Sequence, residues 1–443
     1  MIAQARAAED ALRCGFTSSD FNGRVCLAVG PITLFDKSFL QSLSVDEAVW
    51  FDNFFYPVVS PMFFIETVAN LWKKPREGKT AEEEVGIIAA KTPELHGGPC
   101  YFHREMCIQD LLGNHVPLNG QIPMAGMRRV ERDGKEGAIA EVSPEAKAFQ
   151  RWQRGQFYEV ERLYARKWRE QVESIDLGAV ERTMKQIGVN AKNCRTVDAA
   201  LRYADDAILG LSKTAGRFDA ALKVLEIPEQ LRLHIKQQWK RRGKPPLHIF
   251  APYATHILRV ELFFRFALGA NLVASTRPSH KVDIAYLFYL PFCTLFTSAD
   301  KLHRQCAPLF MRSNQEFVWG PDLKNDLTAL NDHFSALPTE VREQGIFKFA
   351  NRLPEESRGL IWQLFERHAP GLLKPSAVID PLKVDAGAHK KLRDSINAWE
   401  AAPTSQAKSP MSSDRPEMMI IKRSVSRIRG SWLQIDPEVT DKG

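Results

Sequence analysis

Apolar residues gather in two stretches of the chain, and each stretch has the pattern of a buried strand with helices next to it. In the first, an apolar run stops at Asp36 and two helical patterns follow it. Ser44 lies three residues before Glu47, which is the spacing of a capping box, and Ser60 followed by a proline is typical of a helix start. The pattern therefore predicts a strand, a helix and a second helix over residues 26–74.

The second apolar stretch, residues 248–330, has the same components. A strongly apolar helical pattern comes first, a further helix is predicted to start near Asp283, and the short strand "CTLFTS" ends just before Asp300. A strand that carries a carboxylate at its tip usually places it beside water or a cation. Because open α/β sheets gather their chemistry at the carboxyl ends of their strands, the two stretches together predict a three-layer α/β/α core with a mainly parallel sheet.

The remaining segments differ in character. Residues 75–145 are rich in glycine, proline, histidine and methionine, whereas residues 145–242 carry repeated helical patterns. We therefore predict a mainly helical insertion, a helical C-terminal extension and a mostly flexible tail, in which "PEMMIIKRSVSRIRGSWLQI" can order or contact a partner. The predicted division is an N-terminal segment 1–25, a first core half 26–74, an insertion 75–247, a second core half 248–330, an extension 331–373 and a tail 374–443.

Composition and charge narrow the class of protein. The chain has 443 residues, of which 44% are hydrophobic and 26% charged, as in an ordinary soluble protein. Its seven cysteines form no disulfide framework and its N-terminus has no signal-peptide pattern, so we expect a cytoplasmic protein. The two most apolar windows are short and are broken by Arg265 and Pro291, so no membrane partner is expected. A net charge of +7 favours a polyanionic partner only weakly.

Four acidic residues occupy the positions where such a core concentrates its chemistry. They lie at the two strand tips, on an apolar helix and at the head of a helix: Asp36, Asp300, Glu66 and Asp283. A group of carboxylates stays ionised only beside cations, and hard oxygen ligands of this kind hold Mg²⁺ or Mn²⁺, which activate water for attack on a phosphodiester. Three of them also have a structural explanation, with Asp36 and Asp283 as helix caps and Glu66 on an exposed helix face.

Three segments resemble the motifs of PIN-domain nucleases. "ITLFDKSFL" resembles the first motif, an apolar strand that ends in Asp with a hydroxyl residue, Ser38, two positions later. "SPMFFIETVANL" resembles the second, and "KVDIAYLFYLPFCTLFTSAD" resembles the third and fourth together, with its strand closing on Ser298 and Asp300. The resemblance covers the two predicted core halves, roughly a third of the chain. It implies a PIN-like core and a metal site formed by Asp36, Glu66, Asp283 and Asp300, with Ser38 and Ser298 as supporting hydroxyls.

These observations predict a Mg²⁺- or Mn²⁺-dependent nuclease, and specifically an endoribonuclease that prefers single-stranded RNA. The four acidic residues would hold the metal, and one of them would orient the attacking water. Two alternatives stay open. One is a catalytically silent PIN-like protein that binds nucleic acid or a partner, and the other is a regulatory or defence toxin subunit whose insertion binds a protein.

A second chemical signal lies in "HGGPCYFHREMC". This segment supplies the ligand types of a structural zinc site: His96, Cys100, His103 and Cys107. The usual Cys-x-x-Cys pairing is missing, and the adjacent glycines and proline also fit a plain surface loop. The magnesium or manganese site is the favoured prediction, and zinc is the alternative.

Two basic segments are candidates for contact with nucleic acid. The segment "KQQWKRRGKPP" clusters cations around a tryptophan: Lys236, Trp239, Lys240, Arg241 and Arg242. We predict that it returns beside the acidic cleft, where its cations would contact phosphates and Trp239 would stack on a base, with an ordinary solvated helix end as the alternative. In residues 150–174 glutamates interleave with the arginines, which favours an ordinary solvated helix.

Overall fold

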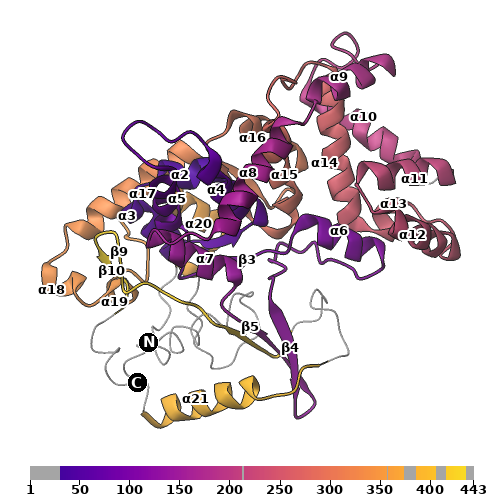
Figure 1. Cartoon of the computed structure of the whole chain (residues 1–443). Coiled ribbons are helices and arrows are strands. Elements are labelled where there is room, and N and C mark those ends of the chain that lie inside the picture. Colours follow the sequence, from indigo (N-terminus) through magenta and orange to yellow (C-terminus); the bar gives the residue numbers. More distant parts are fainter. Residues whose placement is uncertain (1–29, 212–213, 357, 374–385, 406–415, 436–443) are drawn as a thin grey trace.

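The centre of the molecule is a five-stranded parallel β-sheet (Figure 1). The computed structural model describes residues 30–211, 214–356, 358–373, 386–405 and 416–435. The strands lie in the order β3-β2-β1-β6-β7 and comprise Gly98–Pro99, Tyr56–Val59, Ile32–Phe35, Leu295–Ser298 and Glu316–Trp319. Every pair of neighbours in this sheet is parallel. The predicted α/β class with a parallel sheet is therefore confirmed.

The two apolar stretches of the sequence meet in the middle of this sheet. β1 pairs with β6, with Thr33 opposite Leu295 and Phe35 opposite Thr297, although the whole insertion separates them along the chain. The strand order runs in opposite directions on the two sides of β1, so the gap between β1 and β6 is the topological switch point. Residues that follow these two strands therefore lie in the crevice where doubly wound sheets bind their ligands.

Three helices surround β1 and begin where the sequence places their caps. They are α2 (Lys37–Ser42), α3 (Val45–Phe54) and α4 (Pro61–Val68). Asp36 caps α2, Ser60 caps α4, and the hydroxyl of Ser44 accepts a hydrogen bond from the Glu47 N–H at 3.0 Å to cap α3. The strand β2 between α3 and α4 departs from the predicted strand, helix and helix. Its four residues, "YPVV", are too few to carry a period of their own.

The predicted insertion is mostly helical, but it also contributes strands. Its helices are α5 (Ala81–Lys91), α6 (His103–Leu111), α7 (Pro144–Gln153), α8 (Glu159–Glu173), α9 (Leu177–Gln186), α10 (Val197–Leu209), α11 (Ala215–Val224) and α12 (Glu229–Arg241). The edge strand β3 of the main sheet belongs to this segment, as does a hairpin of β4 (Met127–Arg132) and β5 (Lys135–Ala140). Residues 75–99 are therefore continuous with the core sheet. The sequence gives no sign of β3, because a strand of two residues is too short for a hydrophobic period.

The second half of the chain is built around one long helix. The helices after the insertion are α13 (Leu247–Phe250), α14 (Pro252–Gly269), α15 (His280–Ala285), α16 (Lys301–Cys306), α17 (Gly320–Ser335), α18 (Thr339–Arg342), α19 (Ile346–Phe349), α20 (Leu360–His368) and α21 (Ala386–Glu400). The helices α9 to α12 form a helical arm (Figure 1). α14 packs against α9 and α10 of this arm and so joins it to the core. Within the described ranges, no helix combines the length and the apolar character needed to cross a membrane.

The C-terminal segment 416–435 packs back onto the core, which corrects the prediction of a mostly flexible tail and bears out the prediction that this stretch can order. β8 (Met418–Ile421) pairs in parallel with β5, and β9 (Ile428–Arg429) pairs with β10 (Trp432–Leu433). The Trp432 ring lies 4.6 Å from the ring of Trp50, and the Arg429 guanidinium contacts the buried Asp52 carboxylate at 2.9 Å. Residues 374–385, 406–415 and 436–443 of the predicted tail lie outside the described residues.

We expect Arg429→Ala to lower the free energy of unfolding by about 3 kcal/mol, because it leaves the buried Asp52 carboxylate without its cation. Urea unfolding of the full chain measures this loss. Arg427→Ala is the matched control, since Arg427 is an exposed cation two residues away. Equal stabilities of the two variants would show that the Arg429 ion pair does not hold the C-terminal segment to the core.

Candidate active site

Asp36 is the centre of a hydrogen-bonded cluster at the switch point. Its Oδ1 accepts from the Phe39 N–H at 2.9 Å, which caps α2. Its Oδ2 accepts from the hydroxyls of Ser38 at 2.7 Å and Ser298 at 2.8 Å. The two hydroxyl residues predicted as supporting groups therefore both bind the same carboxylate oxygen, although they come from the ends of different strands.

His303 completes this cluster, and sequence reasoning missed it. Its Nδ1 lies 3.3 Å from Asp36 Oδ2 and 2.8 Å from the Ser298 hydroxyl, and its Nε2 donates to the backbone carbonyl of Asp283 at 2.7 Å. Burial disfavours the charged ring, but the Asp36 carboxylate overrides this and raises the His303 pKa to about 9. Burial is the largest influence on Asp36 and opposes its ionisation, but the contact with His303 and the hydrogen bonds from Phe39 and Ser38 together outweigh it and lower the Asp36 pKa. The two residues form a buried ion pair.

Asp283 and Asp300 lie near the same crevice, and each has a carboxylate oxygen that accepts no hydrogen bond from a described group. Asp300 caps α16 through Oδ1, which accepts from the Leu302 N–H at 2.6 Å, and no described group donates to its Oδ2. Asp283 is the fourth residue of α15 and not its cap, which corrects the predicted start of that helix. Its carboxylate has no hydrogen-bond or ion-pair partner among the described residues.

The charges of the other three predicted acidic residues act on Asp283. Burial raises the Asp283 pKa to about 7. The positive charge of His303 opposes this rise, while the negative charges of Glu66, Asp300 and Asp36 add to it. The Asp283 carboxylate therefore lies within electrostatic reach of the other three, and the convergence of all four in one site stays a prediction.

Glu66 lies at the border of this group and not on an exposed helix face. Its Oε2 accepts from the Tyr286 hydroxyl at 2.5 Å, and its Oε1 lies 3.6 Å from the Lys37 ammonium. Tyr286 is a second functional residue that sequence reasoning missed. It follows Asp283 by three positions, so the two lie on the same side of their helical segment.

The fit of this group to Mg²⁺ or Mn²⁺ depends on which oxygens are free. Among the described residues, no three His, Cys, Asp or Glu side chains are arranged as a metal-binding group. Asp36 Oδ2 is engaged by Ser38, Ser298 and His303, whereas Oδ1 accepts only the Phe39 N–H. The unpartnered Asp283 carboxylate and the free oxygen of Asp300 are hard oxygen donors, the ligand type that Mg²⁺ and Mn²⁺ prefer.

The residues of the alternative zinc site form no such site in the described chain. His103 Nδ1 lies 3.2 Å from the Tyr289 hydroxyl, and the thiol of Cys100 lies near that of Cys293. His96 is buried, and its Nδ1 has no partner in the described residues. These side chains belong to the packed core on the β3 side of the sheet.

Burial of neutral histidines predicts a loss of stability in acid. Burial lowers the pKa of His96 to about 3, from an ordinary value of 6.5. The unfolded chain therefore takes up a proton that the folded chain refuses, and stability is lost as the pH falls below 6.5. We expect His96→Phe to lose about 2 kcal/mol less than the wild type between pH 7 and pH 5 in urea unfolding. Equal losses would show that His96 is protonated in the folded protein.

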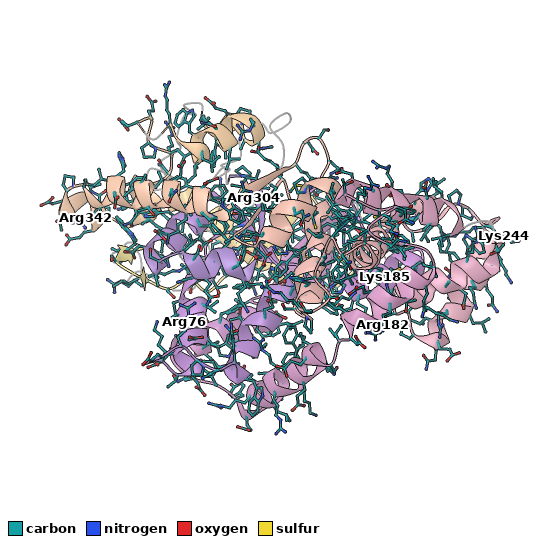
Figure 2. All side chains as sticks on the ribbon, turned by 90° about the horizontal axis from the view of Figure 1, so that it is seen from above. Arg76, Arg182, Lys185, Lys244, Arg304 and Arg342 are labelled. Carbon is teal, nitrogen blue, oxygen red and sulfur yellow. The ribbon has the colours of Figure 1, made fainter. Side chains whose placement is uncertain are left out.

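The basic segment of α12 does not lie beside the acidic residues. Figure 1 places α12 at the far end of the helical arm, and Figure 2 shows Lys244 there, well away from Arg304 of α16. Trp239 is buried and stacks on Phe218 with ring centroids 4.3 Å apart, so the prediction that it stacks on a base is wrong. Lys236 pairs with Asp219 at 2.7 Å. Lys240, Arg241 and Arg242 are exposed, as at an ordinary solvated helix end.

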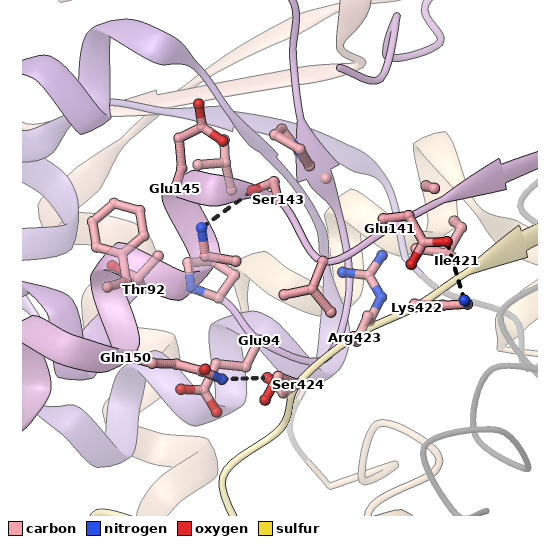
Figure 3. Close-up of a pocket in the computed structure, with 18 of the residues that line it drawn as sticks. Thr92, Glu94, Glu141, Ser143, Glu145, Gln150, Ile421, Lys422, Arg423 and Ser424 are labelled. Carbon is pink, nitrogen blue, oxygen red and sulfur yellow. Dashed lines mark hydrogen bonds and ion pairs between the residues drawn. The ribbon is translucent and has the colours of Figure 1, made fainter. Parts of the chain in front are cut away.

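A cavity of about 80 Å³ lies between the loop before β3, the start of α7 and the C-terminal segment (Figure 3). Gln150 donates to the Ser424 carbonyl and Lys422 pairs with Glu141 at its wall. None of the four acidic residues lines it. The cavity is therefore a feature of the C-terminal contact and separate from the acidic group.

Comparisons of the chain with protein-family models, curated proteins and solved structures found no match. The function that the chain performs is therefore inferred from the residues at the switch point and their geometry.

Proposed function

We propose that the chain is a divalent-metal-dependent nuclease that hydrolyses phosphodiester bonds, with single-stranded RNA as its preferred substrate. The observation that carries this proposal is the Asp283 carboxylate, which is half-buried, has no described partner and has its pKa raised further by the charges of Glu66, Asp300 and Asp36. Burying such a charge is costly unless a cation or a proton compensates it. Its position at the switch point is where doubly wound sheets bind ligands.

The chain's own residues divide the work between holding a metal and fixing its surroundings. Asp283 and Asp300, whose carboxylates have free oxygens, would hold Mg²⁺ or Mn²⁺, which would supply an activated water and neutralise charge on the phosphate. The hydroxyl of Ser298 and the ring of His303 keep Asp36 ionised and fixed. Tyr286 fixes the Glu66 side chain through its hydroxyl, so Glu66 keeps a defined orientation towards the crevice.

A PIN-like core is part of this proposal. The segments that resemble the first and fourth PIN motifs form β1 and β6, which are neighbours in a parallel sheet. Ser38 and Ser298, the hydroxyl positions of those motifs, bind the same Asp36 oxygen. We also infer that the protein acts in the reducing cytoplasm, because the described residues Cys100, Cys107, Cys194, Cys293 and Cys306 are free thiols.

The second candidate is a catalytically silent protein of the same fold. The observation that favours it is the His303 imidazolium, which already gives Asp36 a positive partner in the metal-free protein. A cluster that is partly neutralised in this way can persist for structural reasons alone.

The test is cleavage of end-labelled oligonucleotides by the purified full chain, with Mn²⁺ or with EDTA. We expect cleavage of single-stranded RNA with Mn²⁺, slower cleavage of duplex RNA, and none with EDTA or in Asp283→Asn. Absence of cleavage by the wild type in saturating Mn²⁺ would favour the silent protein. Cleavage that persists in EDTA would contradict a metal-dependent mechanism.

A further inference from the structure

A group of cations borders the acidic residues on the side of α8. The Lys37 ammonium and the Arg169 guanidinium both donate to Asn70 Oδ1, at 3.4 and 3.3 Å. Arg169 also donates to the carbonyl of Ala69 at 3.2 Å, which fixes its side chain against the 3₁₀ helix η2 (Ala69–Trp72). Lys37 in turn lies 3.6 Å from Glu66. Lys37 therefore lies between Glu66 of the acidic group and the other cations.

Two of the cations, Lys73 and Arg169, have no ion-pair partner in the described chain, whereas Lys37 pairs with Glu66. Burial lowers the Lys73 pKa, and the charges of Lys37 and Arg169 lower it further. Neither Lys73 nor Arg169 forms an ion pair with an acidic side chain in the described chain. The acidic groups closest to them are already engaged, Glu66 by Tyr286 and Glu84 by Arg76. Cations held together without acidic partners favour an external anion.

An exposed aromatic ring lies beside these cations. Trp72 is the last residue of η2, immediately before Lys73, and 54% of its surface is exposed. The Arg166 guanidinium lies over its ring, 5.4 Å from the centroid, and leaves the rest of the indole open to solvent. A large exposed indole beside unpaired cations is the combination with which proteins bind single-stranded nucleic acid, because bases stack on the ring while phosphates contact the cations.

We propose that Lys37, Trp72, Lys73 and Arg169, here named the Trp72 surface, bind a single nucleic-acid strand and lead it to the acidic group. The cations contact successive phosphates and a base stacks on Trp72. This inference rests on the proposed function, since it names the surface by which that site takes its substrate. It also assigns to η2 and α8 the role that the sequence predicts for α12.

The test measures binding of a fluorescent single-stranded RNA 12-mer by anisotropy in EDTA, where no cleavage is needed. We expect Lys73→Ala/Arg169→Ala to weaken binding at least about tenfold and to flatten the salt dependence by about 1.4, since each lost phosphate contact removes about 0.7. Lys240→Ala/Arg241→Ala removes the same charge from exposed positions on α12 and should leave both quantities unchanged. Trp72→Ala should weaken binding roughly tenfold, and Trp72→Phe should restore most of it.

Each outcome separates this inference from the proposed function. If the variants lose binding but the wild type cleaves nothing in Mn²⁺, the Trp72 surface stands and the nuclease proposal fails. Equal weakening by Lys73→Ala/Arg169→Ala and Lys240→Ala/Arg241→Ala would overturn the inference. So would a wild type that binds no oligonucleotide but captures an acidic peptide. If Lys73→Ala/Arg169→Ala does not fold, Lys73→Ala/Arg169→Lys replaces it, because lysine keeps a charged hydrogen-bond donor at residue 169.

Discussion

Asp283→Asn is expected to reduce cleavage of single-stranded RNA by at least about two orders of magnitude, because a metal ligand supplies several kcal/mol of transition-state stabilisation. The same change should raise the stability of the metal-free protein. The folded-state pKa of Asp283, about 7, lies above the ordinary value of 3.8, so the ionised carboxylate costs free energy at neutral pH. We expect a gain of about 2 kcal/mol at pH 8.

The stability gain expected for Asp283→Asn depends on pH. The cost of the ionised Asp283 carboxylate develops as the pH rises from 3.8 to about 7 and is constant above that. The stability advantage of Asp283→Asn should therefore be complete above pH 7 and disappear as the pH falls towards 4. Asp322→Asn, at an exposed position on α17, is the control and should change neither cleavage nor stability. A destabilised Asp283→Asn would contradict an unpartnered, half-buried carboxylate.

Asp36→Asn is expected to have the opposite effect on stability, with a loss of about 3 kcal/mol. Repulsion within a group of four carboxylates, considered alone, predicts unchanged or raised stability for this variant. The geometry reverses that expectation, because Asp36 is paired with a buried imidazolium and accepts two serine hydroxyls. Removing its charge leaves the His303 imidazolium buried without a counter-charge.

A double-mutant cycle measures how much of this loss belongs to the ion pair. Urea unfolding of Asp36→Asn, His303→Gln and the double variant should give a double loss that is smaller than the sum of the single losses, by about 1 to 3 kcal/mol. Additive losses would show that Asp36 and His303 do not interact in the folded protein. Asp283→Asn, measured in the same series, should instead gain stability, in contrast to Asp36→Asn.

The sheet and its acidic edge follow from features that a single sequence carries. An apolar run that stops on Asp36 and a second that stops before Asp300 predict two strands whose carboxyl ends meet, and β1 and β6 do pair in parallel. The resemblance to PIN-domain motifs implies Ser38 and Ser298 as supporting hydroxyls, and both contact Asp36. Local patterns sufficed here because strand ends in one parallel sheet necessarily share an edge.

The parts that escaped prediction depend on contacts between distant segments. His303 and Tyr286 gain their roles only when the chain brings them beside Asp36 and Glu66, and nothing local marks them. Trp239 lies in a basic segment whose sequence does not reveal which helix face is buried, and it packs against Phe218. Arg169 lies in a helix whose arginines and glutamates look uniformly solvated, yet it reaches Asn70 beside the acidic group.

Binding of Mn²⁺ to the metal-free protein tests the central claim most directly. The free-Mn²⁺ resonance signal, titrated against protein, counts bound ions without requiring a substrate. We expect the wild type and Asp322→Asn to bind at least one Mn²⁺ per chain and Asp283→Asn/Asp300→Asn to bind none, since that variant removes both carboxylates with free oxygens. Binding that is absent from the wild type, or unchanged in the double variant, would contradict a metal site at the switch point.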